Sequence, residues 1–229
     1  MNTKQPSIYI PAKGIESWKA LLQDPKKQWA AGYSAASIAE AWHRPGDFPP
    51  DVERVFQKAG QPYSGLVPLI CIPEHQVPLP GKGKASHNDV WVLARDDGGL
   101  VSIAVEGKVK EDFDQKLGDW LADSGVNKRV RLEGLKKLIG LTGDLPNTVR
   151  YQLLHRAASA VIEARRFHAK QALLLVHSFS PENLHFEDYA EFTRLYGVEA
   201  QVNELVHLTS EGGIHLDSVW INSAVREAK

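Results

Sequence analysis

Glu106-Gly107-Lys108 places an acid and a lysine, one residue apart, at the end of the apolar run 100–105. Alternate side chains of an extended strand point to the same face, so Glu106 and Lys108 are expected to project together. Asp89 begins the preceding apolar run and can lie beside them across a hairpin. Two carboxylates and an ammonium suit one hard cation and one activated water molecule.

The same acid-x-Lys pattern occurs at residues 24–26, 114–116 and 227–229, so the letters alone are unspecific. The first copy contains a proline, the second falls in an expected helix, and the third stands at the last residues of the sequence. Only residues 106–108 end an apolar strand that follows a hairpin turn, Asp-Asp-Gly-Gly at 96–99. Such a turn tolerates the positive φ of short hairpin loops. The expected secondary structure around residues 106–108 therefore makes this copy the candidate site.

Composition is that of an ordinary soluble globular protein, with 229 residues, 43% hydrophobic and 24% charged. This length suits one domain, predicted at residues 1–229. The net charge of −1 argues against a protein that coats nucleic acid by charge alone, although a local basic groove is still compatible with it.

Localisation signals favour the cytoplasm. Residues 1–11 lack a basic segment followed by an apolar one, and no apolar run approaches the roughly 20 residues that cross a bilayer. We therefore expect no membrane association. Cys71 is the single cysteine, which excludes an internal disulfide and fits a reducing compartment, and its apolar neighbours predict a buried side chain.

Hydrophobic periodicity and turn residues predict the elements that must position these side chains. Helices are expected at residues 15–22, 34–42, 50–59, 110–121, 129–141, 148–167 and 187–196. Strands are expected at residues 66–72, on both sides of the turn within 89–108, and at 172–177, 205–208 and 214–221. Helices thus precede a three-stranded meander, and further helices, one strand, a helix and a hairpin follow. This order predicts a mixed α/β sheet with helices packed against it.

Residues 34–178 resemble the PD-(D/E)XK nuclease superfamily, the restriction-endonuclease-like phosphodiesterases. Asp89 matches the acid that opens the second strand, and Glu106-x-Lys108 matches the motif that closes the third. Glu40 matches an acid found on the preceding helix, and Gln152 a glutamine found on the following helix. Asn88 replaces the usual proline, Arg156 stands where many members have tyrosine, and two helices rather than one precede the next strand. Segments 150–156 and 176–180 also look like an uncharacterised bacterial family without an established activity.

The resemblance implies an αβββαβ core with a mixed β-sheet, a helical N-terminal addition, and a C-terminal helix and hairpin at residues 185–222. It implies a phosphodiester hydrolase that uses Mg²⁺ or Mn²⁺, bound by Asp89 and Glu106, with Glu40 at a second ion or a metal-bound water. Lys108 would orient the attacking water, and Gln152 would position water or phosphate.

The partner implied is the backbone of DNA or RNA, bound without reading the base sequence. Its expected ligands are basic side chains on loop 81–87 and on the helices that follow: Lys82, Lys84, Arg129, Arg131 and Arg156. The loop lacks P-loop spacing, so a plain surface loop is an alternative there. Many members of the superfamily pair to cut both strands, so a homodimer is compatible with the resemblance, and the sequence leaves the oligomeric state open.

Two other interpretations stay open. Glu106 and Lys108 could form only an ion pair at a sheet edge, in an inactive binding or interaction module. A different hydrolase could use His177, His185 and His215, although the sequence contains no GxSxG, HExxH or CxxC pattern.

Overall fold

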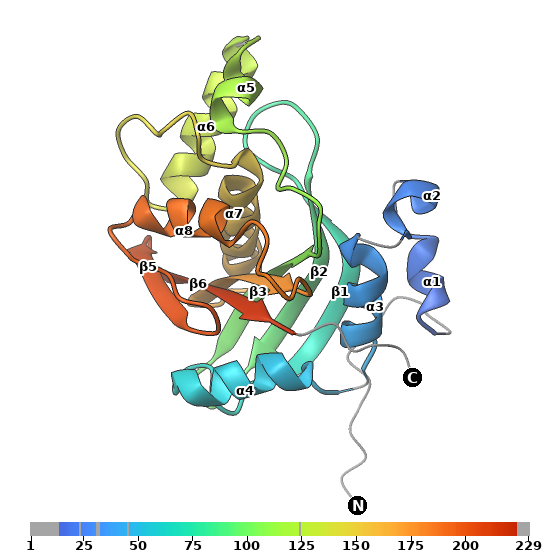
Figure 1. Cartoon of the computed structure of the whole chain (residues 1–229). Coiled ribbons are helices and arrows are strands. Elements are labelled where there is room, and N and C mark those ends of the chain that lie inside the picture. Colours follow the sequence, from blue (N-terminus) through green and yellow to red (C-terminus); the bar gives the residue numbers. More distant parts are fainter. Residues whose placement is uncertain (1–13, 23, 31–32, 45, 124, 224–229) are drawn as a thin grey trace, which may run out of the picture.

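Six strands form one mixed sheet with helices on both of its faces (Figure 1). The chain is represented by a computed structural model, which describes residues 14–22, 24–30, 33–44, 46–123 and 125–223. The strands are β1 Val67–Val77, β2 Ser86–Arg95, β3 Leu100–Lys108, β4 Gln171–Ser178, β5 Leu205–Glu211 and β6 Ile214–Asn222.

The helices differ widely in length, from single turns to the 16 residues of α7. They are α1 Glu16–Lys19, α2 Pro25–Gln28, α3 Ser34–Trp42, α4 Pro50–Ala59, α5 Leu117–Leu121, α6 Val126–Leu138, α7 Tyr151–Arg166 and α8 Phe186–Arg194. Among the described residues, every helix is too short or too polar to cross a membrane.

The strand order is β1-β2-β3-β4-β6-β5. β1, β2 and β3 form an antiparallel meander, and β5 and β6 form an antiparallel hairpin. β4 runs parallel to both β3 and β6. The chain must cross a face of the sheet to enter β4 in the direction of β3, and α7 lies on that path. The predicted mixed α/β sheet flanked by helices is confirmed.

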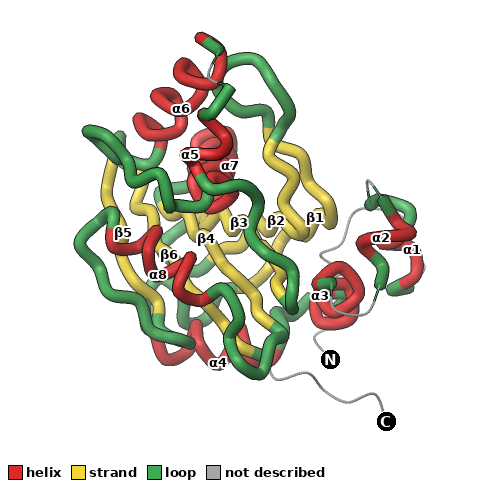
Figure 2. Tube along the Cα trace, turned by 45° about the horizontal axis from the view of Figure 1, so that its top comes forward, coloured by secondary structure: helices red, strands yellow, loops and turns green. Residues whose placement is uncertain are grey.

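Side-chain alternation along the sheet divides the interior into two cores. Ala104 packs on the α7 face, where small residues such as Ala157 and Ala160 let the helix lie close to the strands. Ile103 and Val105 pack on the opposite face with α3 and α4, and buried Cys71 lies in this second core. Figures 1 and 2 show α7 and α4 on opposite sides of the sheet. Glu106 and Lys108 follow Ala104 at intervals of two, which brings them to the α7 face.

Several predicted boundaries were wrong. The strand predicted at 66–72 continues to Val77 through Pro73, because β1 lies at the sheet edge, where a missing backbone N–H is tolerated. The helix predicted at 110–121 is confined to α5, and residues 109–116 form a loop. The helix predicted at 15–22 is only the single turn α1, and the turn α2 was not predicted.

Candidate active site

An open cavity of about 570 Å³ lies where β1, β2 and β3 meet α2, α3, α7 and loop 109–116. It is polar and contains both acids and bases. Its charged and amide side chains include Glu74, Asp89, Glu106, Lys108, Gln152 and Arg156. The structure thus brings together four residues predicted from the sequence for one site (Asp89, Glu106, Lys108 and Gln152).

Three neighbouring strands each contribute one acid to this cavity: Glu74 from β1, Asp89 from β2 and Glu106 from β3. The registers explain the alignment. Pro73 lies opposite Val90 and His75 opposite Asn88, so Glu74 lies beside Asp89. Val90 lies opposite Val105, so Asp89 and Glu106 occupy adjacent positions. We call Glu74, Asp89 and Glu106 the carboxylate row.

Glu106 is surrounded by donors. The Nζ of Lys108 lies 2.6 Å from its Oε1, and the Nε of Arg156 lies 2.5 Å from its Oε2. Gln152 Nε2 also donates to Oε1, at 2.8 Å. Burial alone would raise the pKa of Glu106, but Arg156 and Lys108 outweigh it and lower the pKa to about 2. Glu106 is therefore ionised at neutral pH.

The other two acids of the carboxylate row respond in the opposite direction. Burial, and then repulsion from Glu106, raises the pKa of Asp89 to about 7. Burial, and then repulsion from Asp89, raises the pKa of Glu74 to about 9. A bound cation would favour the ionised form of both, because an opposite charge nearby stabilises a carboxylate.

Backbone contacts fix the positions of Asp89 and β3. Asp89 Oδ2 accepts a hydrogen bond from the backbone N–H of Gly107, at 2.6 Å. A Cβ on Gly107 would lie 2.4 Å from Cγ1 of Ile38 and 2.8 Å from Cβ of Ser34. Glycine between the acid and the lysine is therefore needed for α3 to approach β3.

Loop 109–116 is attached to this site by side chains. Glu111 accepts from the backbone N–H of Ser34, at 2.7 Å, and so connects the loop to the start of α3. Gln152 Oε1 accepts from the backbone N–H of Asp114 at 3.1 Å, and lies 3.4 Å from Lys108 Nζ. The Gln152 contact occupies the backbone N–H of Asp114, which a helix at 110–121 would have used for an intrahelical hydrogen bond.

The remaining predicted residues lie away from the cavity or are buried. Glu40 is exposed on α3 and is not part of the cavity wall, so its predicted role at a second ion is not supported. Lys82, Lys84 and Arg129 are exposed outside the cavity. Arg131 is buried against the 80–84 loop, where it donates to the carbonyls of Pro80 and Lys84 at 3.3 and 2.7 Å. It stabilises this loop and is unavailable to a phosphate.

Arg156 is buried as well, and its guanidinium binds Glu106 and Ser86 Oγ, the latter at 2.9 Å. It shapes the site from inside and is not a surface ligand for a backbone. Glu74, in contrast, was not predicted as a site residue, because it follows Pro73 and lies beyond the strand predicted at 66–72. An acid next to an apolar edge strand was the available signal.

The histidines do not assemble into one hydrolase site. His177 is buried, with Trp42 Nε1 2.9 Å from Nδ1 and Ser223 Oγ 2.8 Å from Nε2. Burial lowers its pKa to about 3, so it is neutral. His215 is exposed on the β5–β6 hairpin, and Asp217 binds His207 at 2.7 Å instead of His215. Nδ1 of His215 lies 2.7 Å from Ser210 Oγ.

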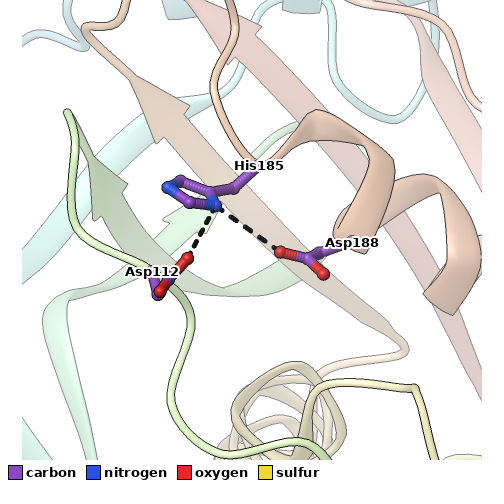
Figure 3. Close-up of side chains that lie close together, drawn as sticks. All are labelled: Asp112, His185 and Asp188. Carbon is purple, nitrogen blue, oxygen red and sulfur yellow. Dashed lines mark ion pairs between the residues drawn. The ribbon is translucent and has the colours of Figure 1, made fainter.

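His185 lies at the N-terminus of α8 between Asp112 and Asp188 (Figure 3). One ligand atom from each of the three residues lies within 4.8 Å of the other two. In the described part of the chain, these three residues are the group of acids, histidines or cysteines close enough together to hold one metal ion. The three acids of the carboxylate row do not meet this spacing.

Comparison with known proteins gave one match. A family model described as a domain of unknown function (DUF6946) matches residues 11–225. Neither the curated proteins nor the solved structures contain a match to this chain.

Proposed function

We propose that this chain, which belongs to the family described as a domain of unknown function (DUF6946), is a divalent-cation-dependent phosphodiesterase that acts on DNA or RNA. The observation that carries the proposal is the carboxylate row with Lys108 and Gln152 in one open cavity. Hard oxygen ligands next to an ammonium and an amide suit hydrolysis of a phosphate ester.

The fold supports the same proposal. An antiparallel meander, a long helix and a parallel fourth strand follow one another from β1 to β4. This is the order expected for a restriction-endonuclease-like core, with β5 and β6 added after it. We therefore propose that residues 34–178 form such a core.

The carboxylate row fits a hard cation by the chemistry of its donors. Asp89 and Glu106 would hold Mg²⁺ or Mn²⁺, with Glu74 as a further oxygen ligand. The bound ion would supply an activated water and offset negative charge that develops on the phosphate. Asp89 keeps one oxygen for this purpose, because only its Oδ2 accepts from Gly107.

Lys108 would place a positively charged side chain of the protein next to the phosphate, in addition to the bound ion. Its ammonium is buried and held 2.6 Å from Glu106, so it does not need to reorganise when a phosphate arrives. Gln152 donates to Glu106 through its amide nitrogen, and its oxygen accepts from Asp114. It fixes the Glu106 carboxylate and the cavity wall at the same time, and we assign it a positioning role.

Nucleic acid would approach over exposed cations outside the cavity, which are Lys82, Lys84 and Arg129. Such contacts are to phosphate and carry no base sequence information. Cleavage would therefore depend on salt and show little base preference.

A second candidate is a binding module without catalysis, and the ion pairs favour it. Glu106 is bound by both Lys108 and Arg156, which leaves little negative charge for a cation. Fold similarity alone does not decide between an active and an inactive site. This alternative predicted an ion pair at a sheet edge, and that location was wrong. Glu106 and Lys108 are on β3, which lies between β2 and β4 inside the sheet.

A cleavage screen separates the two candidates. Single- and double-stranded DNA and RNA are incubated with Mg²⁺, with Mn²⁺ or with EDTA, for the wild type, Asp89→Asn and the exposed control Asp119→Asn. Asparagine keeps an acceptor for Gly107 and removes the charge. We expect cleavage with metal only, retained in Asp119→Asn and lost in Asp89→Asn. Cleavage that survives EDTA, or equal cleavage by both variants, would contradict the proposal. Binding of nucleic acid without cleavage under every condition would favour the second candidate.

A further inference from the structure

The Asp112–His185–Asp188 cluster joins the outer part of loop 109–116 to the first turn of α8 (Figure 3). His185 Nδ1 lies 3.0 Å from Asp112 Oδ1 and 3.6 Å from Asp188 Oδ2. None of these residues belongs to the carboxylate row, although Asp112 also lines the cavity.

Hydrogen bonding fixes which nitrogen of His185 is available. Nε2 lies 3.1 Å from the carbonyl oxygen of Lys110. A carbonyl oxygen can only accept, so Nε2 carries the proton and donates. Metal-binding histidines commonly donate their second ring N–H to such a carbonyl, which orients the ring. Nδ1 is then left with its lone pair facing two carboxylate oxygens. That arrangement requires a positive ion between them, either a second proton or a metal.

Arg150 balances part of the negative charge. Its Nε lies 2.9 Å from Asp188 Oδ1, and one of its terminal nitrogens lies 3.6 Å from Asp112 Oδ1. One guanidinium faces two carboxylates, so one negative charge has no counterpart when His185 is neutral. The two oxygens of Asp188 have different partners: Oδ2 faces the imidazole of His185, and Oδ1 binds Arg150. Asp112 is two-thirds exposed, which leaves room for water to complete a coordination shell.

We propose that Asp112, His185 and Asp188 bind a divalent transition-metal ion such as Zn²⁺. One imidazole nitrogen and two carboxylate oxygens suit Zn²⁺, Mn²⁺ or Co²⁺, whereas Mg²⁺ prefers oxygen ligands alone. The ion would fasten the loop that forms one wall of the cavity to α8. This inference does not require the proposed phosphodiesterase activity.

Calorimetric titration with Zn²⁺ in excess Mg²⁺ tests the site. His185 has φ 70°, a left-handed conformation that asparagine accepts, so His185→Asn removes the imidazole with little backbone strain. His168→Asn is the matched control, because His168 is exposed and has φ 55°. We expect the wild type and His168→Asn to bind one Zn²⁺ equivalent that His185→Asn lacks or binds roughly tenfold or more weakly.

Asp112→Asn provides a second variant on the exposed loop, in case His185→Asn disturbs folding, and it should weaken the same equivalent. Asp89→Asn should retain that equivalent, which separates failure here from failure of the proposed function. The proposal would be overturned by a wild type that binds no Zn²⁺, or by unchanged binding in both His185→Asn and Asp112→Asn. The first result would mean that a proton occupies the position between the carboxylates, and the second that Zn²⁺ binds elsewhere on the chain.

Discussion

The acids of the carboxylate row differ in their protonation state at neutral pH. Glu106 is ionised between two cations, whereas Glu74, two strands away, has a pKa of about 9 and carries a proton at neutral pH. Burial is the main reason for the raised pKa of Glu74, with repulsion from Asp89 second. An acid held neutral in this way costs stability whenever the unfolded chain would ionise it.

Glu74→Gln should therefore stabilise the metal-free protein, and more so at higher pH. The ordinary pKa of the carboxyl is 4.5, and folding raises it to about 9. Between these values the folded chain retains a proton that the unfolded chain releases, so the free energy of unfolding falls as pH rises, by up to about 1.4 kcal/mol per unit. Glutamine removes this loss. Urea unfolding at pH 5 and pH 8 measures the effect.

Glu40→Gln is the control for this measurement, because Glu40 is exposed on α3. It should change stability equally at both pH values. If Glu74→Gln gave the same difference from wild type at pH 5 and pH 8, Glu74 would ionise normally and the account of the row would be wrong.

At the residue scale, the sequence predicted four residues of the site and missed one. Asp89, Glu106, Lys108 and Gln152 could be found because an apolar strand, a hairpin turn and a helical stripe each fixed their positions. Glu74 could not, because the predicted strand ended at residue 72, before Pro73. Arg131 was predicted to be a surface ligand, because the sequence does not indicate that the carbonyls of the 80–84 loop will bind its guanidinium.

At the level of elements, the contact between α3 and β3 depends on Gly107. The backbone there lies so close to Ser34 and Ile38 that a methyl group has no space. Ser34 Cβ belongs to the helix itself, so relief requires α3 to move. The same glycine donates its N–H to Asp89, which links helix docking to the geometry of the site.

Gly107→Ala should accordingly lower the free energy of unfolding by about 1–3 kcal/mol, as overpacking a core does. Gly98→Ala is the matched control in the exposed 96–99 turn, where a Cβ would meet Asp96 Oδ1 at an ordinary 3.4 Å. Chemical denaturation of both variants measures the difference. Equal stability of the two variants would show that α3 does not pack as described.

Loop 109–116 illustrates what periodicity cannot predict. Phe113, Leu117 and Trp120 have helical spacing, yet only residues 117–121 are helical. The loop is held from outside instead. Arg150 donates to the carbonyls of Phe113 and Asp114 at 3.1 and 3.2 Å, and Gln152 accepts from Asp114. These partners are far away in sequence, so local pattern carries no sign of them.

Arg150→Met should loosen this loop while the strands stay protected. Methionine keeps part of the apolar stem and removes the donors to Phe113 and Asp114. We expect faster amide hydrogen exchange at residues 109–116 and no change in β3 or β4. The exposed Arg129→Met variant serves as the control. Unchanged exchange in the loop would mean that Gln152 and Glu111 hold it without Arg150.

At the scale of the whole molecule, the sheet separates two cores and opens at one end into the cavity. β3, β4 and β6 contribute alternate side chains to both cores, so neither core is complete without the sheet. This plan was predictable from the order of elements, since a meander, a long amphipathic helix and a further strand leave few arrangements. The depth of burial of Glu106 and Lys108, each about 2% exposed, was not predictable.

The central claim is that Lys108 acts on a phosphodiester at this cavity. The most direct measurement is single-turnover cleavage, with Mg²⁺ or Mn²⁺, by the wild type, Lys108→Met and the exposed control Lys116→Met. Methionine keeps the apolar stem of lysine, and circular dichroism verifies that each variant is folded. The account predicts cleavage by the wild type and Lys116→Met, and at least about a hundredfold slower cleavage by folded Lys108→Met, in line with the loss of one transition-state donor. Equal cleavage by folded Lys108→Met and Lys116→Met would contradict it.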